Sequence, residues 1–221
     1  MENLSYQTAE GENLFSNLNF VLNRGDKISF LGESRAVTAL FEILNGKITP
    51  SSGSFEFGQT ISTAYLPSDN SAYFENSKEN LVDWLRNFTD GDVDKDDVYI
   101  RGFLGKMLFS GEEVMKKASV LSGGEKMRCM LSKMMQSEAN FLMFDEPTNH
   151  LDLESITALN NSLIDFKGTI LFTSHDHTFT HTVANRIIEI GPKGMLDKVM
   201  TYDDYLESEK ITSQREELAI A

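Results

Sequence analysis

The chain has little cysteine, a shortage of cationic side chains and no long apolar run. Its 221 residues include one cysteine, Cys129, so no disulfide can form within the chain. No apolar stretch approaches the 18 residues that a membrane-spanning helix needs. Lys and Arg number 20 against 34 Asp and Glu, which gives a net charge of −14. This charge argues against sequence-independent binding to nucleic acid by the chain alone.

The same absences set expectations for location and partners. The first residues, MENLSYQTAEGE, lack the basic and apolar regions of a secretory signal. We therefore expect a cytoplasmic protein with no membrane contact and no direct, sequence-specific contact with DNA. A hydrophobic content of 40% and a charged content of 24% are ordinary for a globular domain.

Short apolar segments alternate with helical patterns along most of the chain. Strands are expected at 18–23, 27–31, 54–57, 61–66, 141–144, 169–173 and 186–190, and helices at 38–45, 78–88, 98–109, 125–135 and 153–166. The alternation predicts a mainly parallel α/β sheet. Residues 69–120 interrupt it with helices alone, so we expect an inserted helical subdomain there. The polar residues 207–221 are expected to form a mobile helical tail or the start of an extension.

The most informative motif is the run Leu-Ser-Gly-Gly-Glu at 121–125. Ser122 and Glu125 have the spacing of a capping box at the start of a helix. A capping box does not require Gly123 and Gly124, which would cost roughly 1 kcal/mol each in a helix interior. Two glycines leave bare amides at the positive end of the helix, where an anion can approach closely. We interpret this segment as an anion-binding helix start.

A buried strand that ends in two carboxylates follows in the run FLMFDEPTNHLD at 141–152. Ligands bind at the carboxyl ends of strands in open α/β sheets. Because side chains alternate along a strand, Asp145 and Glu146 are expected to do different tasks, one at a metal and phosphate and one at an attacking water. Asp152 can cap the next helix. His175, after the apolar strand 169–173, could be a plain surface histidine, but its order after the two motifs favours a functional role.

Two metal motifs are weaker. His177 and His181 have the i, i+4 spacing of a zinc-binding pair on a helix. No cysteine or acidic residue completes an evident site with them in the sequence. Residues 90–101 resemble a calcium loop, but they lack its central glycine and its final glutamate. We expect neither segment to bind a metal.

On these motifs the chain resembles an ATP-binding-cassette (ABC) nucleotide-binding domain, an α/β domain of the P-loop NTPase fold. DEPTNHLD and VLSGGEKMRCMLSKMM together resemble the ABC-F family, transporter-free cassette ATPases of which many act on the ribosome. The resemblance covers residues 2–206, so we expect a nucleotide-binding domain over 1–206 with the helical subdomain at 69–120. It implies ATP and Mg²⁺ as cofactors. It also implies a second cassette as partner, in the same chain or in a dimer, and the ribosome as a further partner.

The resemblance also assigns roles by position. Residues 122–125 match the signature motif that contacts nucleotide. Asp145 matches the aspartate of the magnesium site, and Glu146 matches the catalytic glutamate. Asp152 matches the D-loop aspartate, and His175 matches the switch histidine, which we group with Glu146 as catalytic.

The phosphate loop departs from the family pattern GxNGxGKST. The equivalent segment, GESRAVTA at 32–39, is one residue short and lacks the inner glycines and the lysine. The remaining candidates for nucleotide binding are Gly32, Ser34, Arg35, Thr38 and Ala39, and Thr38 also retains a hydroxyl for magnesium. Loss of the lysine removes a charge-assisted contact of about 1.5–3 kcal/mol.

Two further departures affect the same half-site. Ser68 stands where the family usually has a glutamine, and Tyr6 offers an adenine-stacking ring about two residues out of place. The leading hypothesis is therefore the C-terminal cassette of an ABC-F ATPase, which couples ATP use to clamp closure on a ribosomal or similar target. It would serve its partner's ATP site fully and its own poorly, so the isolated domain should have weak or no ATPase activity. The alternatives are a non-hydrolysing regulatory pseudo-cassette and the ATPase subunit of a membrane transporter.

Overall fold

The computed structural model describes residues 1–89 and 96–218. Its centre is a six-stranded sheet of order β5-β6-β7-β3-β8-β9. The strands are β3 (Lys27–Gly32), β5 (Thr63–Leu66), β6 (Phe141–Phe144), β7 (Thr169–Phe172), β8 (Arg186–Gly191) and β9 (Gly194–Lys198). Five of them are parallel, and β9 pairs with β8 in the antiparallel direction. The predicted α/β fold is confirmed.

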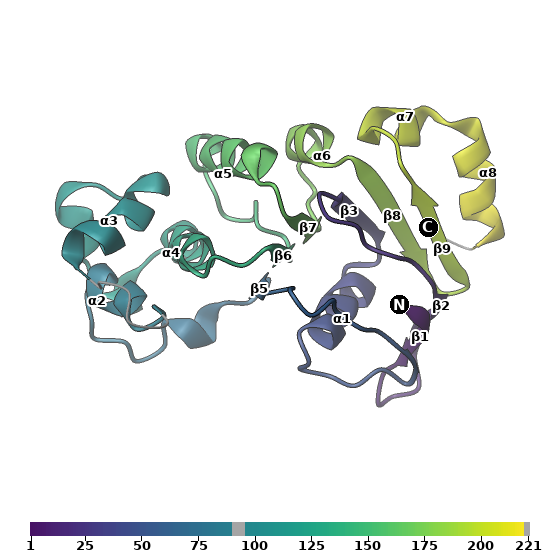
Figure 1. The fold of residues 1–221 in the computed structure, drawn as a ribbon, viewed down its shortest axis with the longest axis horizontal. Coiled ribbons are helices and arrows are strands. Elements are labelled where there is room, and N and C mark those ends of the chain that lie inside the picture. The colour runs from purple at the N-terminus through teal and green to yellow at the C-terminus, as the bar shows by residue number, and fades with distance from the viewer. Residues whose placement is uncertain (90–95, 219–221) are drawn as a thin grey trace.

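A second, three-stranded antiparallel sheet has the order β2-β1-β4. It consists of β1 (Glu2–Gln7), β2 (Asn13–Leu18) and β4 (Ser52–Ser54), and it lies beside α1 (Ser34–Leu44) (Figure 1). The predicted strand at 18–23 is wrong, and so is most of that at 54–57. Phe15 and Leu18 are fully buried within β2, whereas Val21 is 71% exposed. The apolar alternation at 18–23 therefore does not reflect a paired strand.

Helices cover both faces of the six-stranded sheet (Figure 1). α1 lies on one face, and α4 (Gly123–Gln136) and α5 (Leu153–Asp165) lie on the other. The side chains of β6 alternate between these faces. Leu142 and Phe144 pack in the cluster that contains α4 and α5, and Phe141 and Met143 pack in the cluster that contains α1.

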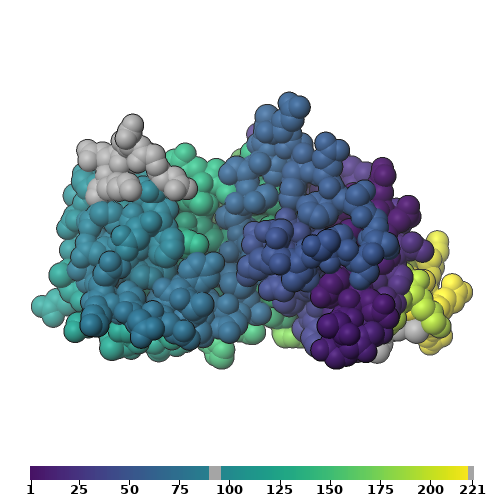
Figure 2. Space-filling view, turned by 90° about the horizontal axis from the view of Figure 1, so that it is seen from below, coloured from purple at the N-terminus to yellow at the C-terminus, as the bar shows by residue number. Residues whose placement is uncertain are grey.

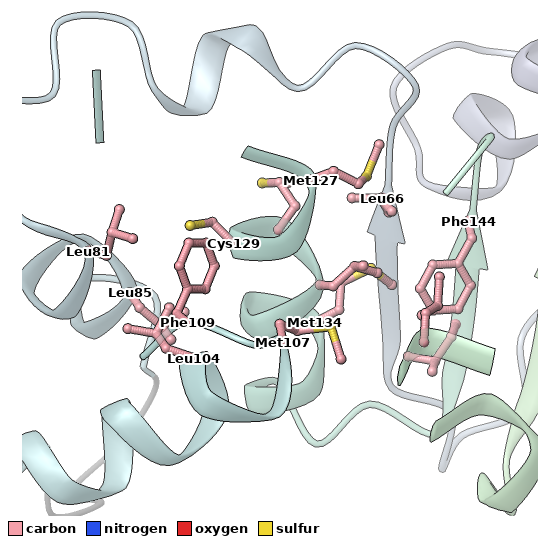
Figure 3. Packing of buried hydrophobic residues seen from close by; sticks show 14 of the residues in the cluster. Leu66, Leu81, Leu85, Leu104, Met107, Phe109, Met127, Cys129, Met134 and Phe144 are labelled. Carbon is pink, nitrogen blue, oxygen red and sulfur yellow. The ribbon is translucent and has the colours of Figure 1, made fainter. Parts of the chain in front are cut away.

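The described residues between β5 and α4 form helices and no named strand. These are η1 (Ser71–Tyr73), α2 (Leu81–Arg86), α3 (Asp97–Lys106), η2 (Gly111–Met115) and η3 (Ala118–Val120). They gather at the end of the molecule away from the N-terminal sheet (Figures 1 and 2). Leu85, Leu104 and Phe109 pack against α4 through Cys129 and Met127 (Figure 3). Residues 90–95 of the calcium-like run lie outside the described residues.

The C-terminal segment forms α7 (Tyr202–Glu207) and α8 (Glu209–Glu217), which lie beside β8 and β9 (Figure 1). Residues 209–217 are helical as expected, but they are docked rather than free. Ile211 is only 4% exposed, and Arg215 forms a 2.9 Å ion pair with the buried Glu189 of β8. Tyr205 donates a 2.6 Å hydrogen bond to the same carboxylate. No helix among residues 1–89 and 96–218 is long and apolar enough to cross a membrane.

Candidate functional site

Several of the predicted site residues meet at the carboxyl edge of the parallel sheet. Gly32 ends β3, and Asp145 directly follows β6. The Oγ1 of Thr38, in α1, donates a 2.7 Å hydrogen bond to Oδ2 of Asp145 across 107 residues of sequence. These two strands are not neighbours, because β7 lies between β6 and β3. The Thr38 side chain makes the contact across that gap.

The connection from β3 to α1 is a single residue, Glu33. The helix begins at Ser34, which is exposed. The Glu33 carbonyl accepts hydrogen bonds from the amides of Ala36 (2.9 Å) and Val37 (3.2 Å). These two amides are therefore used inside the first turn of the helix. A loop that wraps a phosphate needs such amides unpaired and convergent.

Gly32 and Ala39 both have packing reasons for their small side chains. Gly32 has a φ of +119°, and a Cβ there would lie 2.3 Å from the carbonyl oxygen of Ile190 in β8. Close approach of the two strands therefore requires glycine. Ala39 is 6% exposed and belongs to the core between α1 and the sheet. Neither residue needs a ligand to explain it.

Arg35 is engaged with carboxylates of the protein itself. Its Nη1 and Nη2 each donate a 2.8 Å hydrogen bond to Glu12, and its Nε donates at 2.7 Å to Glu33. These hydrogen bonds raise the pKa of Arg35, and those from Arg35 lower the pKa of the Glu12 carboxyl. The bidentate geometry is the one that guanidinium groups also use for phosphate. In this structure the Glu12 carboxylate, and not a phosphate, accepts the two hydrogen bonds from the Nη atoms of Arg35.

Asp145 is held by two threonine hydroxyls. It is 2% exposed, and besides the bond from Thr38 it accepts a 3.3 Å hydrogen bond from Oγ1 of Thr173. The same Thr173 oxygen accepts from the amide of Glu146 at 2.9 Å. Sequence reasoning missed Thr173 as a site residue. Thr173 lies at the end of an apolar strand and two residues before His175, and this place in the sequence could have identified it as a site residue.

Glu146 is a buried carboxylate with one free oxygen. It is 8% exposed and has a φ of +53°, which is uncommon for a residue with a Cβ. Its Oε1 lies 3.3 Å from Nε2 of His175, whose side chain is 81% exposed. Its Oε2 is buried without a hydrogen-bond partner among the described residues. Burial raises the pKa of Glu146, as Asp145 also does, while His175 opposes the shift. Such a group can orient or deprotonate water.

The signature segment has the predicted capping box. Oγ of Ser122 accepts from the Glu125 amide at 3.3 Å, and Oε2 of Glu125 accepts from the Ser122 amide at 2.9 Å. Lys116 lies 2.7 Å from the other Glu125 oxygen. The hydrogen bond from Lys116 is the largest cause that lowers the pKa of Glu125 to about 2.

The two glycines of the signature differ in their surroundings. A Cβ on Gly124 would lie 2.6 Å from the backbone oxygen of His150, whereas a Cβ on Gly123 would make ordinary 3.6 Å contact with the His150 side chain. Gly124 is therefore required by packing, a reason that the sequence did not reveal. Gly123 is exposed.

The remaining candidates have structural contacts of their own. Asp152 caps α5, because its Oδ1 accepts from the Ser155 amide at 2.8 Å. This hydrogen bond lowers the pKa of Asp152. Ser68 is exposed. The Tyr6 ring packs on Phe15 with centroids 6.2 Å apart, within the core beside α1.

Asp203, in α7, supplies the acidic neighbour that the sequence did not show for the histidine pair. Nε2 of His177 lies 3.0 Å from one Asp203 oxygen, and Nδ1 of His181 lies 2.9 Å from the other. The two rings are parallel, with centroids 6.2 Å apart. Within the described ranges, no group of three or more His, Cys, Asp or Glu side chains is arranged to hold a metal ion.

This geometry defines the class of the protein. A parallel sheet with helices on both faces carries Asp145, Glu146 and His175 at its carboxyl edge, which is the arrangement of a nucleotide-binding domain of the P-loop NTPase fold. The family model described as ABC transporter matches residues 15–149, more than half of the chain. The chain therefore belongs to the ABC transporter family and is an ABC ATPase domain.

Curated relatives give the same assignment. The chain is 59% identical to the ABC transporter ATP-binding protein YkpA of Bacillus subtilis over 213 residues, which is 96% of this chain and 39% of that protein. It is 40% identical to the probable ATP-binding protein YbiT of Escherichia coli O157:H7, over 90% of this chain and 37% of the relative. It is 31% identical to the energy-dependent translational throttle protein EttA of Haemophilus influenzae, over 90% of this chain and 36% of that protein. The chain thus spans well under half the length of these relatives.

Solved structures share the fold. The post-hydrolysis dimer of the ATP-binding cassette MJ0796, bound to ADP and Pi, matches with a TM-score of 0.73 and 14% identity, over 90% of this chain and 97% of the other. An inward-facing ABC transporter of the metal-chelate type matches with a TM-score of 0.72 and 23% identity, over 96% of this chain and 86% of the other. At these identities the matches show the fold alone.

ABC ATPase domains bind ATP, typically with Mg²⁺, and the residues present fit these cofactors in part. The Thr38 hydroxyl and the Asp145 carboxylate are oxygen donors of the kind that Mg²⁺ prefers, and their oxygens lie 2.7 Å apart. The β3–α1 connection is one residue long, and Arg35 is bound to carboxylates.

Proposed function

We propose that the chain is a cassette of an ABC-F-type ATPase whose signature motif completes the ATP site of a second cassette, while its own phosphate site is degenerate. In this proposal residues 1–206 form the cassette, with residues 69–120 as its helical subdomain. The pair couples ATP binding and hydrolysis to clamp closure on a ribosomal or similar target. The relative EttA, whose name describes a translational throttle, supports that choice of target.

The contrast between the two half-sites carries the proposal. On the signature side, Ser122 and Gly123 are exposed at the start of a 14-residue helix whose first turn is fixed by a capping box. The positive end of that helix suits an anion presented by another cassette. On the phosphate-loop side, the amides of Ala36 and Val37 are already paired. The domain is therefore better equipped to serve a partner's nucleotide than its own.

Two exposed apolar side chains support a partner surface at the signature. Val120 is 70% exposed two residues before Ser122, and Leu153 is 80% exposed at the start of α5. The 150–152 segment joins Leu153 to His150, whose backbone oxygen lies so close to Gly124 that a Cβ there would be 2.6 Å from it. Apolar residues that gather at an exposed site are typical of protein interfaces. The partner that fits is a second cassette.

Residue roles in the proposal follow the geometry. Gly123 and Gly124 present amides to the partner's nucleotide. On the chain's own side, Asp145 and Thr38 hold magnesium, Glu146 orients or deprotonates water, and His175 responds to the transferred phosphate. This second set lacks the phosphate cradle, so it contributes little turnover by itself.

A non-hydrolysing pseudo-cassette is the second candidate function. One observation favours it, namely the direct 2.7 Å hydrogen bond between Thr38 and Asp145, the two groups that would otherwise both bind magnesium. Measurement of ATP turnover separates the candidates. A pseudo-cassette gives no increase in ATP turnover when it is added to an intact cassette. A cassette whose signature motif completes the intact cassette's ATP site raises the turnover.

The test mixes this chain with an intact cassette, or uses the two-cassette protein, and measures ATP hydrolysis. Gly123→Asp places a carboxylate at the helix start and should lower turnover on the order of 100-fold, as loss of one preorganised donor does. Gly123→Ala is the matched control and should keep most of the activity, because its Cβ makes only ordinary contacts. Gly124 is unsuitable for this test, since any side chain there meets the His150 backbone.

Arg35→Ala tests the chain's own site in the same assay. If it lowers turnover as much as Gly123→Asp, the chain's own site is active and the asymmetric proposal is wrong. Cosedimentation of the two-cassette protein with ribosomes, with and without a slowly hydrolysed ATP analogue, tests the target. Absence of nucleotide-dependent cosedimentation would count against the ribosome.

A further inference from the structure

An apolar cavity of about 280 Å³ lies between α4 and α5, over β6. Each of these elements contributes to its wall. The lining includes Leu131 and Met134 from α4, Leu142 and Phe144 from β6, and Leu159 and Leu163 from α5. Figure 3 shows Met134 and Phe144 in the packing between the helix and the sheet.

The polar groups around the cavity do not call for a charged or strongly polar ligand. The Ser162 hydroxyl is already used, because it donates a 2.9 Å hydrogen bond to the Ala158 carbonyl within α5. Glu138 is the one charged residue of the lining, and it is exposed at the rim. An ion inside would lose its hydration without gaining a partner. The chemistry of the wall therefore selects neutral, apolar molecules.

The volume sets the size of the ligand. Engineered apolar cavities of about 150 Å³ remain dry and bind benzene. The space between α4 and α5 is nearly twice as large and is partly open to solvent, so it accommodates a molecule with two fused rings. We propose that the space between α4 and α5 is a binding site for a neutral, apolar small molecule of that size.

The site lies toward the carboxyl ends of the two helices, because its lining residues fall between 131 and 139 and between 159 and 166. α4 begins at Gly123, and α5 begins directly after its cap, Asp152. A molecule in this space therefore contacts the halves of α4 and α5 that follow their starts. The site goes beyond the proposed function and does not depend on the state of the phosphate loop.

The experiment measures the thermal unfolding of the whole chain with indole as probe and indole-2-carboxylate as its charged control. At ten times its Kd, indole should raise Tm by about 3–6 °C, and the carboxylate should not. Ser162→Phe directs a ring into the cavity and should abolish the response. Ser162→Ala leaves the cavity open and should retain it. No nucleotide is present, so the result is independent of the ATPase proposal.

Three outcomes would overturn the site. These are no effect of indole on Tm at its solubility limit, an equal effect of the two probes, and a response of the Ser162→Phe protein as strong as that of the native chain. Ser162→Leu, which fills less space, provides a second filling variant if the phenylalanine variant does not fold, and its response should be smaller than that of Ser162→Ala.

Discussion

Replacement of Gly124 by alanine should destabilise the fold even without any nucleotide or partner. A Cβ at this position would lie 2.6 Å from the backbone oxygen of His150, a separation that real Cβ contacts do not show. His150 cannot yield easily, because it already holds a φ of +65°. At Gly123, one residue earlier in the same helix turn, the added Cβ would meet the His150 side chain at an ordinary 3.6 Å.

The two substitutions have the same chemistry, so their difference isolates the contact. Overpacking of this kind costs about 1–3 kcal/mol. Alanine in a helix gains up to about 1 kcal/mol over glycine. We therefore expect Gly124→Ala to be about 1–3 kcal/mol less stable than Gly123→Ala, which corresponds to roughly 2–12 °C in Tm for a domain of this size. Gly123→Ala should be neutral or stabilising by up to about 1 kcal/mol.

Urea unfolding followed by circular dichroism measures both variants against the native chain. The m-value should remain unchanged, since the surface exposed on unfolding is the same. If the two variants agree in stability to within about 0.5 kcal/mol, the close approach of Gly124 to His150 does not limit the fold. The packing explanation for Gly124 would then be refuted, and the glycine would need a ligand-based explanation.

Three further predictions concern the site carboxylates. Thr38→Val removes the hydrogen bond to the buried Asp145 and should lower stability by about 1–3 kcal/mol in urea unfolding, while Thr38→Ser, which keeps the hydroxyl, should not. Burial raises the pKa of Glu146, so its ionised form costs stability as pH rises above 4.5. Glu146→Gln should therefore raise Tm at pH 7, and a lower Tm would contradict this. The pKa of Glu125 is lowered to about 2 by Lys116, so its contribution is complete above pH 4.5 and disappears as pH falls through 2. Scans of Tm from pH 6 to 2 should show a steeper loss for the native chain than for Glu125→Gln.

Local motifs were predictable because the residues that form them lie close together in the chain. The capping box of Ser122 and Glu125 depends on two residues three positions apart, and Asp152 caps a helix through an amide three positions away. The division of tasks between Asp145 and Glu146 follows from strand alternation. Their separate partners, Thr38 and His175, agree with it.

Contacts between distant segments needed the folded chain. The strand order, with β7 between β3 and β6, is visible only in the folded sheet. Apolar alternation at 18–23 could not reveal that β1 pairs instead with 13–18, since both segments contain buried residues. Asp203 lies against the histidine pair on α6 (His177–Val183), although more than 20 residues separate them in the sequence.

The sequence by itself therefore determined the chemistry at each helix start and strand end, because capping and alternation are properties of a few consecutive residues. Tertiary structure decided what each group faces. It gave Gly124 a packing role against His150, paired Arg35 with Glu12, and opened the cavity between α4 and α5. These depend on the distances between elements, which are set by the packing of whole side-chain layers and not by any local pattern.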